Sequence, residues 1–454
     1  MMRSLVLLAA FFPVVAAFAG EAPCEVRVFG DAPAGAINHA LVGIAPGGNY
    51  HSYLKPEVVQ AIGGIGLKTG RLEGVTASYA ELYDPATGKY DWTRLDREIE
   101  AMKKAGIKTI IADLYYTPKW LAASPAAADF YARRPGDLKA WSKYVSDIVR
   151  HVNIERKYGI TYWEFWNEPS GWLFNQDGGN RAFFEFYAAT AKAIKSADPA
   201  ALVGGFGDNA NYPEHYQAFF AFAKATGAPI DFLTYHWYGE WEANGERRPD
   251  LYFQFTKALA DTYEAAFGRR VPVFISEWNM NGERADGTPA QHAAFLAASL
   301  FWMQESGLSG ACFFCAENYR DLKRGLLDDQ VRPVQAARVL AMFVRLPAQR
   351  VDARWNNPEF TVLAGRGGGK LGVMVSRNSA AAAAGPAALT LKLGGLGQPG
   401  LRKVDLCVED AGSAGVPGAL KSAQVRTVAV AKDGTATLLM EMKGFSVLLI
   451  TLGL

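Results

Sequence analysis

The feature that most constrains this chain is a repeating order of short apolar runs and amphipathic segments. Eight runs have the length and composition of β-strands: residues 39–46, 67–74, 107–115, 162–169, 201–207, 232–239, 271–278 and 310–318. The segments between them have helical spacing, as in residues 92–105, where Leu95, Ile99 and Met102 share one face and Gly106 follows as a stop. Eight strand-then-helix units predict an α/β fold, a (β/α)8 TIM barrel over residues 36–340.

A doubly wound open sheet is the competing architecture. Such a sheet normally carries a glycine-rich phosphate turn directly after an early strand. Here the glycine-rich stretch at residues 63–66 precedes a strand. The barrel is therefore favoured, and no nucleotide cofactor is expected.

The sequence pattern changes after about residue 340. Short alternating runs occur at residues 360–363, 371–375, 389–393 and 425–430, separated by Ala, Gly and Pro-rich stretches. These runs predict a C-terminal β-sandwich over residues 341–454, which an N-terminal strand at residues 24–30 joins. That arrangement would bring Cys24 towards Cys407, so a disulfide between them is an open question.

The N-terminus predicts export. Residues 1–20 contain Arg3, an apolar run over residues 5–17 and the sequence Ala17-Phe18-Ala19, which has the form of a signal-peptidase site. A membrane anchor is the alternative, but the run is shorter than the ~20 residues that span a bilayer. We therefore expect a periplasmic or secreted protein with no stable membrane span after cleavage.

Charge and ligand spacing argue against several classes of function. The 47 basic and 45 acidic residues leave a net charge of +2 without a Lys/Arg-rich tract, so no nucleic-acid partner is expected. Cys312 and Cys315 have the C-x-x-C spacing of redox or metal sites, but no second Cys or His pair lies nearby. We interpret them as buried thiols, and expect neither a metal nor a cofactor.

Two glutamates end apolar, aromatic strands. Glu168 lies in the run at residues 163–169, and Glu277 in the run at residues 274–278. In a TIM barrel the carboxyl ends of the strands form the catalytic rim, and strands four and seven face each other across it. Glycoside hydrolysis uses two carboxyl groups, about 5–5.5 Å apart when the anomeric configuration is retained. The alternative is that both glutamates are solvated residues at strand ends and have no catalytic function.

These motifs carry a resemblance to a known family. Trp166-Asn167-Glu168-Pro169 and Ser276-Glu277-Trp278, with residues 69–72 and 235–239, resemble the clan A glycoside hydrolases, and within that clan family 39. Residues 116–120 and 325–328 are also similar to that family. The resemblance covers roughly residues 38–345, and its most specific part is the pair of strand-four and strand-seven motifs.

The resemblance implies a role for each matching residue. Glu168 would be the acid/base, with a raised pKa, and Glu277 the nucleophile of a retaining double displacement. The residues implied or proposed to bind substrate or support the pair are Arg71, Asn167, His236, Tyr238, Trp278, Trp120 and Glu317. The alternative for His236 is a histidine buried in the core with its hydrogen bonds satisfied. The alternative for each tryptophan is packing in the core.

The substrate is less constrained than the chemistry. Clan A enzymes commonly carry a Trp at the end of strand eight, where this chain has Phe313, Phe314 and Glu317. The aromatic-rich loops at residues 172–181 and 238–248 favour endo-cleavage of a polysaccharide or oligosaccharide, as in family 39 members that trim bacterial exopolysaccharide. An exo-acting β-xylosidase is the nearest alternative, and a non-catalytic carbohydrate-binding protein is the alternative from another class. The oligomeric state is not predicted.

Overall fold

The computed structural model describes residues 21–47, 52–77, 82–171, 179–239, 248–280, 288–318, 325–379, 385–413, 418–421 and 424–454. The signal-peptide prediction concerns residues 1–20, which lie outside this set. Among the described residues, none of the helices combines the length and apolar character that a membrane span requires.

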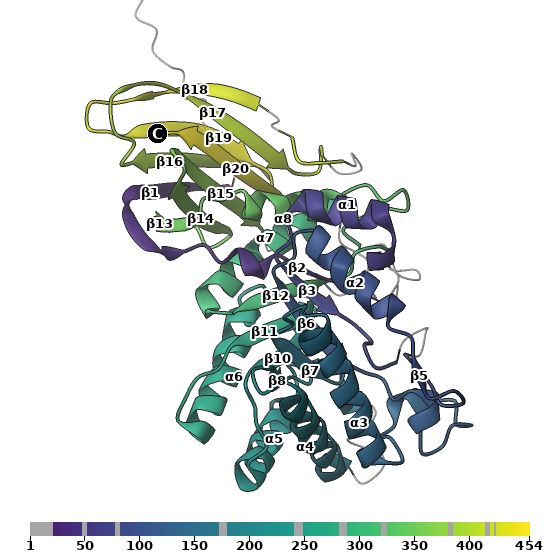
Figure 1. Cartoon of the computed structure of the whole chain (residues 1–454). Coiled ribbons are helices and arrows are strands. Elements are labelled where there is room, and N and C mark those ends of the chain that lie inside the picture. The colour runs from purple at the N-terminus through teal and green to yellow at the C-terminus, as the bar shows by residue number, and fades with distance from the viewer. Residues whose placement is uncertain are drawn as a thin grey trace, which may run out of the picture.

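A parallel sheet forms the centre of the larger part of the molecule (Figure 1). Its order is β8-β7-β6-β3-β2-β12-β11-β10-β9. The strands are β2 (Gly43–Ala45), β3 (Thr69–Leu72), β6 (Thr109–Leu114), β7 (Tyr162–Phe165), β8 (Leu202–Gly204), β9 (Asp208–Asn209), β10 (Leu233–Trp237), β11 (Val273–Trp278) and β12 (Gly310–Phe314). A parallel bridge between Gly204 and Phe232 joins β8 to the start of β10. This strand order is that of a TIM-like barrel, and each of the eight predicted runs contains one of its strands.

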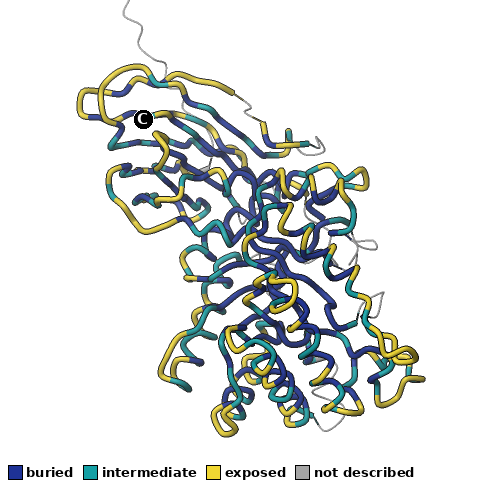
Figure 2. Tube along the Cα trace, viewed as in Figure 1, coloured by how far each residue is buried: buried dark blue, intermediate teal, exposed yellow. Residues whose placement is uncertain are grey.

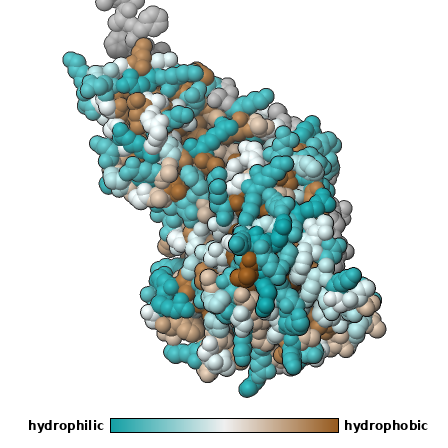
Figure 3. Space-filling model, viewed as in Figure 1, coloured by the Kyte–Doolittle hydropathy of each residue, from teal (hydrophilic) through white to brown (hydrophobic). Residues whose placement is uncertain are grey.

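Helices alternate with these strands along the chain. They are α1 (Pro56–Ile65), α2 (Thr93–Lys104), α3 (Leu138–Val149), α4 (Gly179–Ala197), α5 (Pro213–Thr226), α6 (Leu251–Phe267), α7 (Pro289–Ser306) and α8 (Gln335–Val344). Helix α2 buries Leu95, Ile99 and Met102, the face that the sequence spacing predicts. The strands are mostly buried whereas the outer faces of the helices are exposed (Figure 2). Figure 3 shows mainly hydrophilic residues over this helical part, as amphipathic helices around a sheet require.

The rest of the chain forms a second, mixed sheet of nine strands. Its order is β18-β17-β20-β15-β14-β13-β1-β16-β19. The strands are β1 (Glu21–Ala36), β13 (Gln349–Trp355), β14 (Phe360–Gly367), β15 (Lys370–Asn378), β16 (Ala387–Gly394), β17 (Gly400–Glu409), β18 (Gln424–Val430), β19 (Ala436–Met442) and β20 (Phe445–Gly453). Strand β1 pairs antiparallel with β13 and parallel with β16, so the N-terminal segment lies inside this C-terminal sheet. A two-layer sandwich over residues 341–454 stays a prediction.

The two parts are packed together through α7 and α8. Leu363, Met374 and Leu449 of the second sheet belong to the same apolar cluster as the barrel core. Arg338 on α8 makes a two-pronged, buried ion pair with Glu409 on β17, at 2.6 and 2.8 Å. Continuous apolar contact together with a buried ion pair fixes the second sheet against the barrel.

The open question of a disulfide is answered by the positions of the cysteines. Cys24 and Cys407 are both free. Cys24 lies on β1 in the core of the second sheet, whereas Cys407 lies on β17 and joins the barrel-side cluster. Burial raises the pKa of the Cys24 thiol to about 11, so it is neutral at physiological pH. Cys312 and Cys315 are also free and buried, as the sequence interpretation expects.

Candidate active site

Arg71 is the central cation at the carboxyl end of the barrel strands. It lies on β3 and is completely buried. Its Nε donates to Glu164 at 2.7 Å and its Nη1 to Glu277 at 2.6 Å, while Nη2 donates to Asn167 at 3.0 Å and pairs with Asp113. Because these partners come from β7, β11 and β6, one guanidinium group joins the ends of four strands.

Glu277 is held from two sides. Its Oε1 accepts from Arg71, and its Oε2 accepts from the hydroxyl group of Tyr238 at 2.5 Å. The side chain is 8% exposed. Two strong donors on a nearly buried carboxylate fix its orientation.

Glu168 occupies a different environment, just beyond β7. Trp166 and Glu168 adopt positive φ angles of 68° and 46°, a region that non-glycine residues rarely occupy. The amide of Glu168 donates to the carbonyl oxygen of Gly207 at 3.3 Å. The side chain of Glu168 is 42% exposed. The strained turn therefore lifts this carboxyl group towards solvent, in contrast to Glu277.

His236 connects Glu168 to the interior. Its Nδ1 lies 2.8 Å from Glu168 Oε1 and 3.6 Å from Glu277 Oε2, and its Nε2 lies 3.1 Å from Ser276 Oγ. Ser276 in turn donates to Glu164 at 2.7 Å. Gly207 packs so closely here that a Cβ atom would lie 2.7 Å from His236 Nε2, and its φ is also positive, at 56°. A side chain at position 207 would displace the imidazole ring.

The electrostatics of this pair correct one prediction. Burial acts to raise the pKa of Glu168, but the hydrogen bond and charge of His236, together with Arg71, outweigh it and hold that pKa below its usual value. Burial acts to lower the pKa of His236, but the charge of Glu277 and the bond to Glu168 raise it. The predicted rise in the Glu168 pKa is therefore wrong for the free site, because the proton resides on the neighbouring imidazole.

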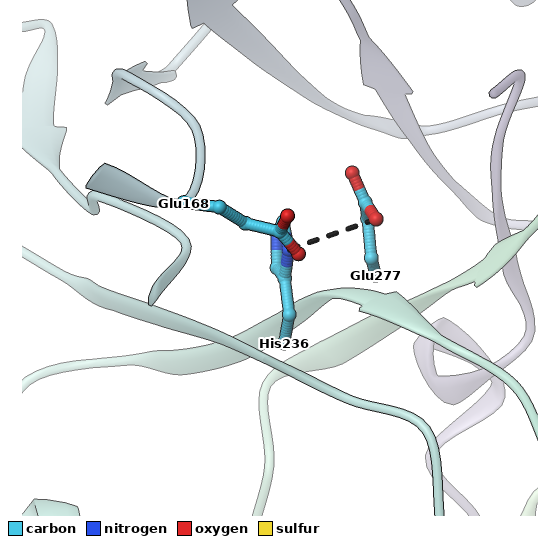
Figure 4. Close-up of side chains that lie close together, drawn as sticks. All are labelled: Glu168, His236 and Glu277. Carbon is cyan, nitrogen blue, oxygen red and sulfur yellow. Dashed lines mark hydrogen bonds and ion pairs between the residues drawn. The ribbon is translucent and has the colours of Figure 1, made fainter. Parts of the chain in front are cut away.

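The two candidate catalytic carboxyl groups face each other across a short gap (Figure 4). An oxygen of Glu168, a nitrogen of His236 and an oxygen of Glu277 all lie within 4.8 Å of one another. These are also metal-ligand types, but here the imidazole already bonds Glu168 and Ser276. The separation matches the short spacing of retaining glycosidases and falls below the ≈ 6.5–9.5 Å that inverting enzymes need for an intervening water.

Two further predicted residues, Asn167 and Tyr238, also lie at this site. Asn167 accepts a hydrogen bond from Arg71 through Oδ1. This bond fixes the orientation of the side-chain amide and therefore the direction of its N–H groups. Tyr238 contacts Glu277, and its ring meets that of Phe314 edge-on at a centroid distance of 6.0 Å. Phe314 thus occupies the end of β12, beside the nucleophile candidate, where clan A enzymes commonly have Trp.

Trp278 does not belong to the site. It is completely buried and packs against Tyr252 and Phe313, at ring distances of 5.8 and 5.4 Å. Its assignment as a substrate-binding residue is wrong, because alternation along β11 points Glu277 into the mouth and its neighbour towards the helices.

Trp120 and Glu317 are engaged in contacts with other parts of the barrel. Trp120 packs on Tyr83 and Tyr144, at ring distances of 4.7 and 5.3 Å. Glu317 accepts from Ser52 at 2.6 Å and from Lys55 at 2.9 and 3.0 Å. These contacts indicate packing for Trp120 and loop anchoring for Glu317, so binding of substrate by either residue stays a prediction.

Sequence reasoning missed three buried carboxyl groups around Arg71. Glu73 follows β3, Asp113 lies on β6 and Glu164 on β7, and none is more than 4% exposed. Burial raises the pKa of Glu73 to about 8, although Arg71 opposes the rise, and burial raises the pKa of Asp113 well above its usual value. The sequence signal that could have identified them is an acidic residue at the end of an apolar strand. Glu73 also follows Arg71 by two positions, which places both side chains on the same face of the strand.

The barrel and its two close carboxyl groups define the class of glycoside hydrolases. Comparison with known families gives the assignment within that class. The model described as "Glycosyl hydrolases family 39" matches residues 65–306, more than half of the chain, and the protein belongs to this family.

Individual relatives agree with this assignment. A "Beta-xylosidase" of Geobacillus stearothermophilus is 30% identical over 210 residues, an alignment that covers 42% of this chain and 41% of the relative. The chain thus matches about two fifths of the length of that curated relative. The fold is similar to those of a glucosidase from Croceicoccus marinus (TM-score 0.76, 18% identity, covering 96% of this chain and 99% of that one) and a monomeric beta-xylosidase from Caulobacter crescentus CB15 (0.76, 18%, 94% and 99%).

Proposed function

We propose that the protein is a retaining, exo-acting β-glycosidase of the β-xylosidase type. The observation that carries the retaining mechanism is the approach of oxygens of Glu168 and Glu277 to within 4.8 Å. The β-xylosidase names of relatives at 30% and 28% identity support the type of substrate.

Exposure and hydrogen bonding support different roles for the two carboxyl groups. The nucleophile must be ionised and fixed, which suits Glu277 between Arg71 and Tyr238. The acid/base must reach both the leaving group and the incoming water, which suits Glu168 with its 42% exposed side chain.

The reaction then takes two steps. Glu277 attacks the anomeric carbon while Glu168 gives a proton to the glycosidic oxygen, and the bond between that carbon and oxygen breaks. In the second step Glu168 takes a proton from water, the water oxygen bonds to the anomeric carbon, and Glu277 leaves. The proton for the first step is held by the pair of Glu168 and His236, and Asn167 is suited to hydrogen-bond the sugar's 2-hydroxyl group.

Endo-cleavage of an exopolysaccharide stays a prediction from the sequence. The loops that favour it, residues 172–181 and 238–248, fall largely outside the described residues. Export to the periplasm or medium likewise stays a proposal, which rests on residues 1–20.

Two measurements test the proposal. NMR of the first product from an aryl β-xyloside should show the β-anomer, and first appearance of the α-anomer would contradict retention. Digestion of xylo-oligosaccharides should release xylose one unit at a time. Mid-chain fragments from a defined polysaccharide, without monosaccharide, would contradict the exo mode and favour endo-cleavage.

A further inference from the structure

Three side chains join two neighbouring loops at the rim of the barrel. Glu317 follows β12, whereas Ser52 and Lys55 lie between β2 and α1. Lys55 Nζ donates to both carboxylate oxygens of Glu317, at 2.9 and 3.0 Å, and the buried Ser52 Oγ donates to Oε2 at 2.6 Å. We call these three residues the clasp, because they tie the β12–α8 loop to the β2–α1 loop.

A backbone contact joins the same two loops closer to the nucleophile. Gly47, just after β2, has a φ of 77°, and a Cβ atom there would lie 2.6 Å from Cys315 Cβ and 3.2 Å from the ring of Phe314. The ring of Phe314 meets that of Tyr238, which donates to Glu277. The join between the loops therefore begins beside the candidate nucleophile and ends at the clasp.

The strand order places this join across the mouth from Glu168. Strand β12 is next to β2 (Figure 1), and it lies opposite β7, with β8, β10 and β11 between them on one side and β6, β3 and β2 on the other. A general acid contacts the glycosidic oxygen, so the leaving group lies on the side of Glu168. The sugar that Glu277 attacks then extends towards β12 and β2, with its non-reducing end nearest the clasp.

We propose that the clasp fixes an end wall, formed by the joined β2–α1 and β12–α8 loops, which leaves room for one sugar on the glycone side of the cut. The inference rests on the proposed exo-acting function and names the residues that impose it. Ser52, Lys55 and Glu317 are then specificity-determining residues, since a second sugar at the non-reducing end would meet the join between the loops.

The charge of Glu317 makes the join depend on its donors. The side chain is 14% exposed, and a carboxylate that has lost most of its water is stable where donors replace that water. Without Ser52 Oγ and Lys55 Nζ, the carboxylate gains hydration by turning away from the β2–α1 loop. A carboxylate accepts about four hydrogen bonds, and three here come from the clasp, so loop anchoring uses most of its capacity.

The product test uses an aryl β-xylobioside, which loses its aryl group in one step only if two sugars fit on the glycone side. The full-length wild-type protein should release xylose first and the aryl alcohol after a lag. In Ser52→Ala/Lys55→Met the lag should disappear, and the ratio of xylobiose to xylose among the first products should rise about tenfold or more. Lys55→Arg should keep the wild-type pattern, because a guanidinium group can bond both carboxylate oxygens.

Three results of this test would overturn the inference. One is immediate release of xylobiose by the wild type, and another is a double variant that keeps the lag and releases xylose alone. The third is a higher KM for an aryl β-xyloside in the double variant with xylose still the first product, which would assign Glu317 to binding of the sugar.

Hydrogen exchange measured by mass spectrometry tests the clasp without a substrate. In Lys55→Met, the amides of Leu326 and Leu327, which donate to Cys315 and Ala316, should exchange about two- to fivefold faster. Lys143→Met is the matched control, since its ion pair with Asp147 lies within α3 and joins no loops. Unchanged exchange in both Lys55→Met and the double variant would overturn the clasp. If exchange rises but the wild type hydrolyses no aryl β-xyloside, the proposed function has failed while the clasp stands.

Discussion

The Nδ1 atom of His236 lies 2.8 Å from Oε1 of Glu168, so an imidazole and a carboxyl group share one hydrogen bond at the mouth of the barrel. With the pKa of His236 raised and that of Glu168 lowered, the pair carries one proton that resides on the ring in the free site. A general acid needs that proton within reach of the leaving group. In the proposed mechanism, the histidine holds the proton that Glu168 transfers to the glycosidic oxygen.

Glu277→Gln should abolish turnover. The amide cannot form the glycosyl ester, and it replaces a charge that Arg71 and Tyr238 both contact. We expect kcat to fall by more than about 10³-fold while the affinity for oligosaccharide largely persists. Steady-state kinetics and calorimetry on the same preparation check this. Hydrolysis at the wild-type rate would contradict the mechanism and agree with a different nucleophile.

Glu168→Gln should slow the reaction according to the leaving group. Loss of the general acid costs about 10²–10⁴-fold for a substrate with a poor leaving group and less for an activated aryl glycoside. Added azide should restore turnover of the aryl substrate and give a β-glycosyl azide, because it attacks the intermediate without a general base. An equal loss for both substrates, without azide rescue, would contradict the acid/base assignment.

His236→Asn should shift the pH profile of kcat/KM. In the wild type the proton on the pair is lost as the pH rises through the raised pKa of His236, above its ordinary 6.5. Without the ring the proton depends on Glu168 alone, so the alkaline limb should move to lower pH and the rate at neutral pH should fall about 10²-fold or more. An alkaline limb that stays in place would show that His236 does not hold the catalytic proton.

Arg338→Ala should destabilise the whole protein. It leaves the carboxylate of Glu409 buried and unpaired between α8 and β17, a change that costs about 3–5 kcal/mol. Denaturant unfolding followed by fluorescence measures the loss. Arg354→Ala is the control, because its pair with Asp352 is exposed and should contribute less than about 1 kcal/mol. Similar losses in the two variants would contradict the role of the buried pair.

Much of the barrel could be predicted because its signals are local. The alternation of apolar runs and amphipathic segments locates eight barrel strands, β2, β3, β6, β7, β8, β10, β11 and β12, but not the short β9. Leu95, Ile99 and Met102 correctly give the buried face of α2. Glu168 and Glu277 stand out because each is an acidic residue at the end of an apolar, aromatic strand. Side-chain periodicity and hydropathy depend on residues that are close in the sequence, so both can be recognised without the structure.

The supporting contacts of the site were decided only by the tertiary structure. Arg71 meets Glu73, Asp113, Glu164 and Glu277 because four strands distant in sequence end at one place. Closure of the barrel also buried Trp278 in the core. It brought His236 next to Glu168, and this contact lowers the pKa of Glu168, which the sequence predicted to rise. The sequence by itself determined the fold class and the two glutamates, whereas distance and burial, which exist only after the sheet forms, determined their charges and partners.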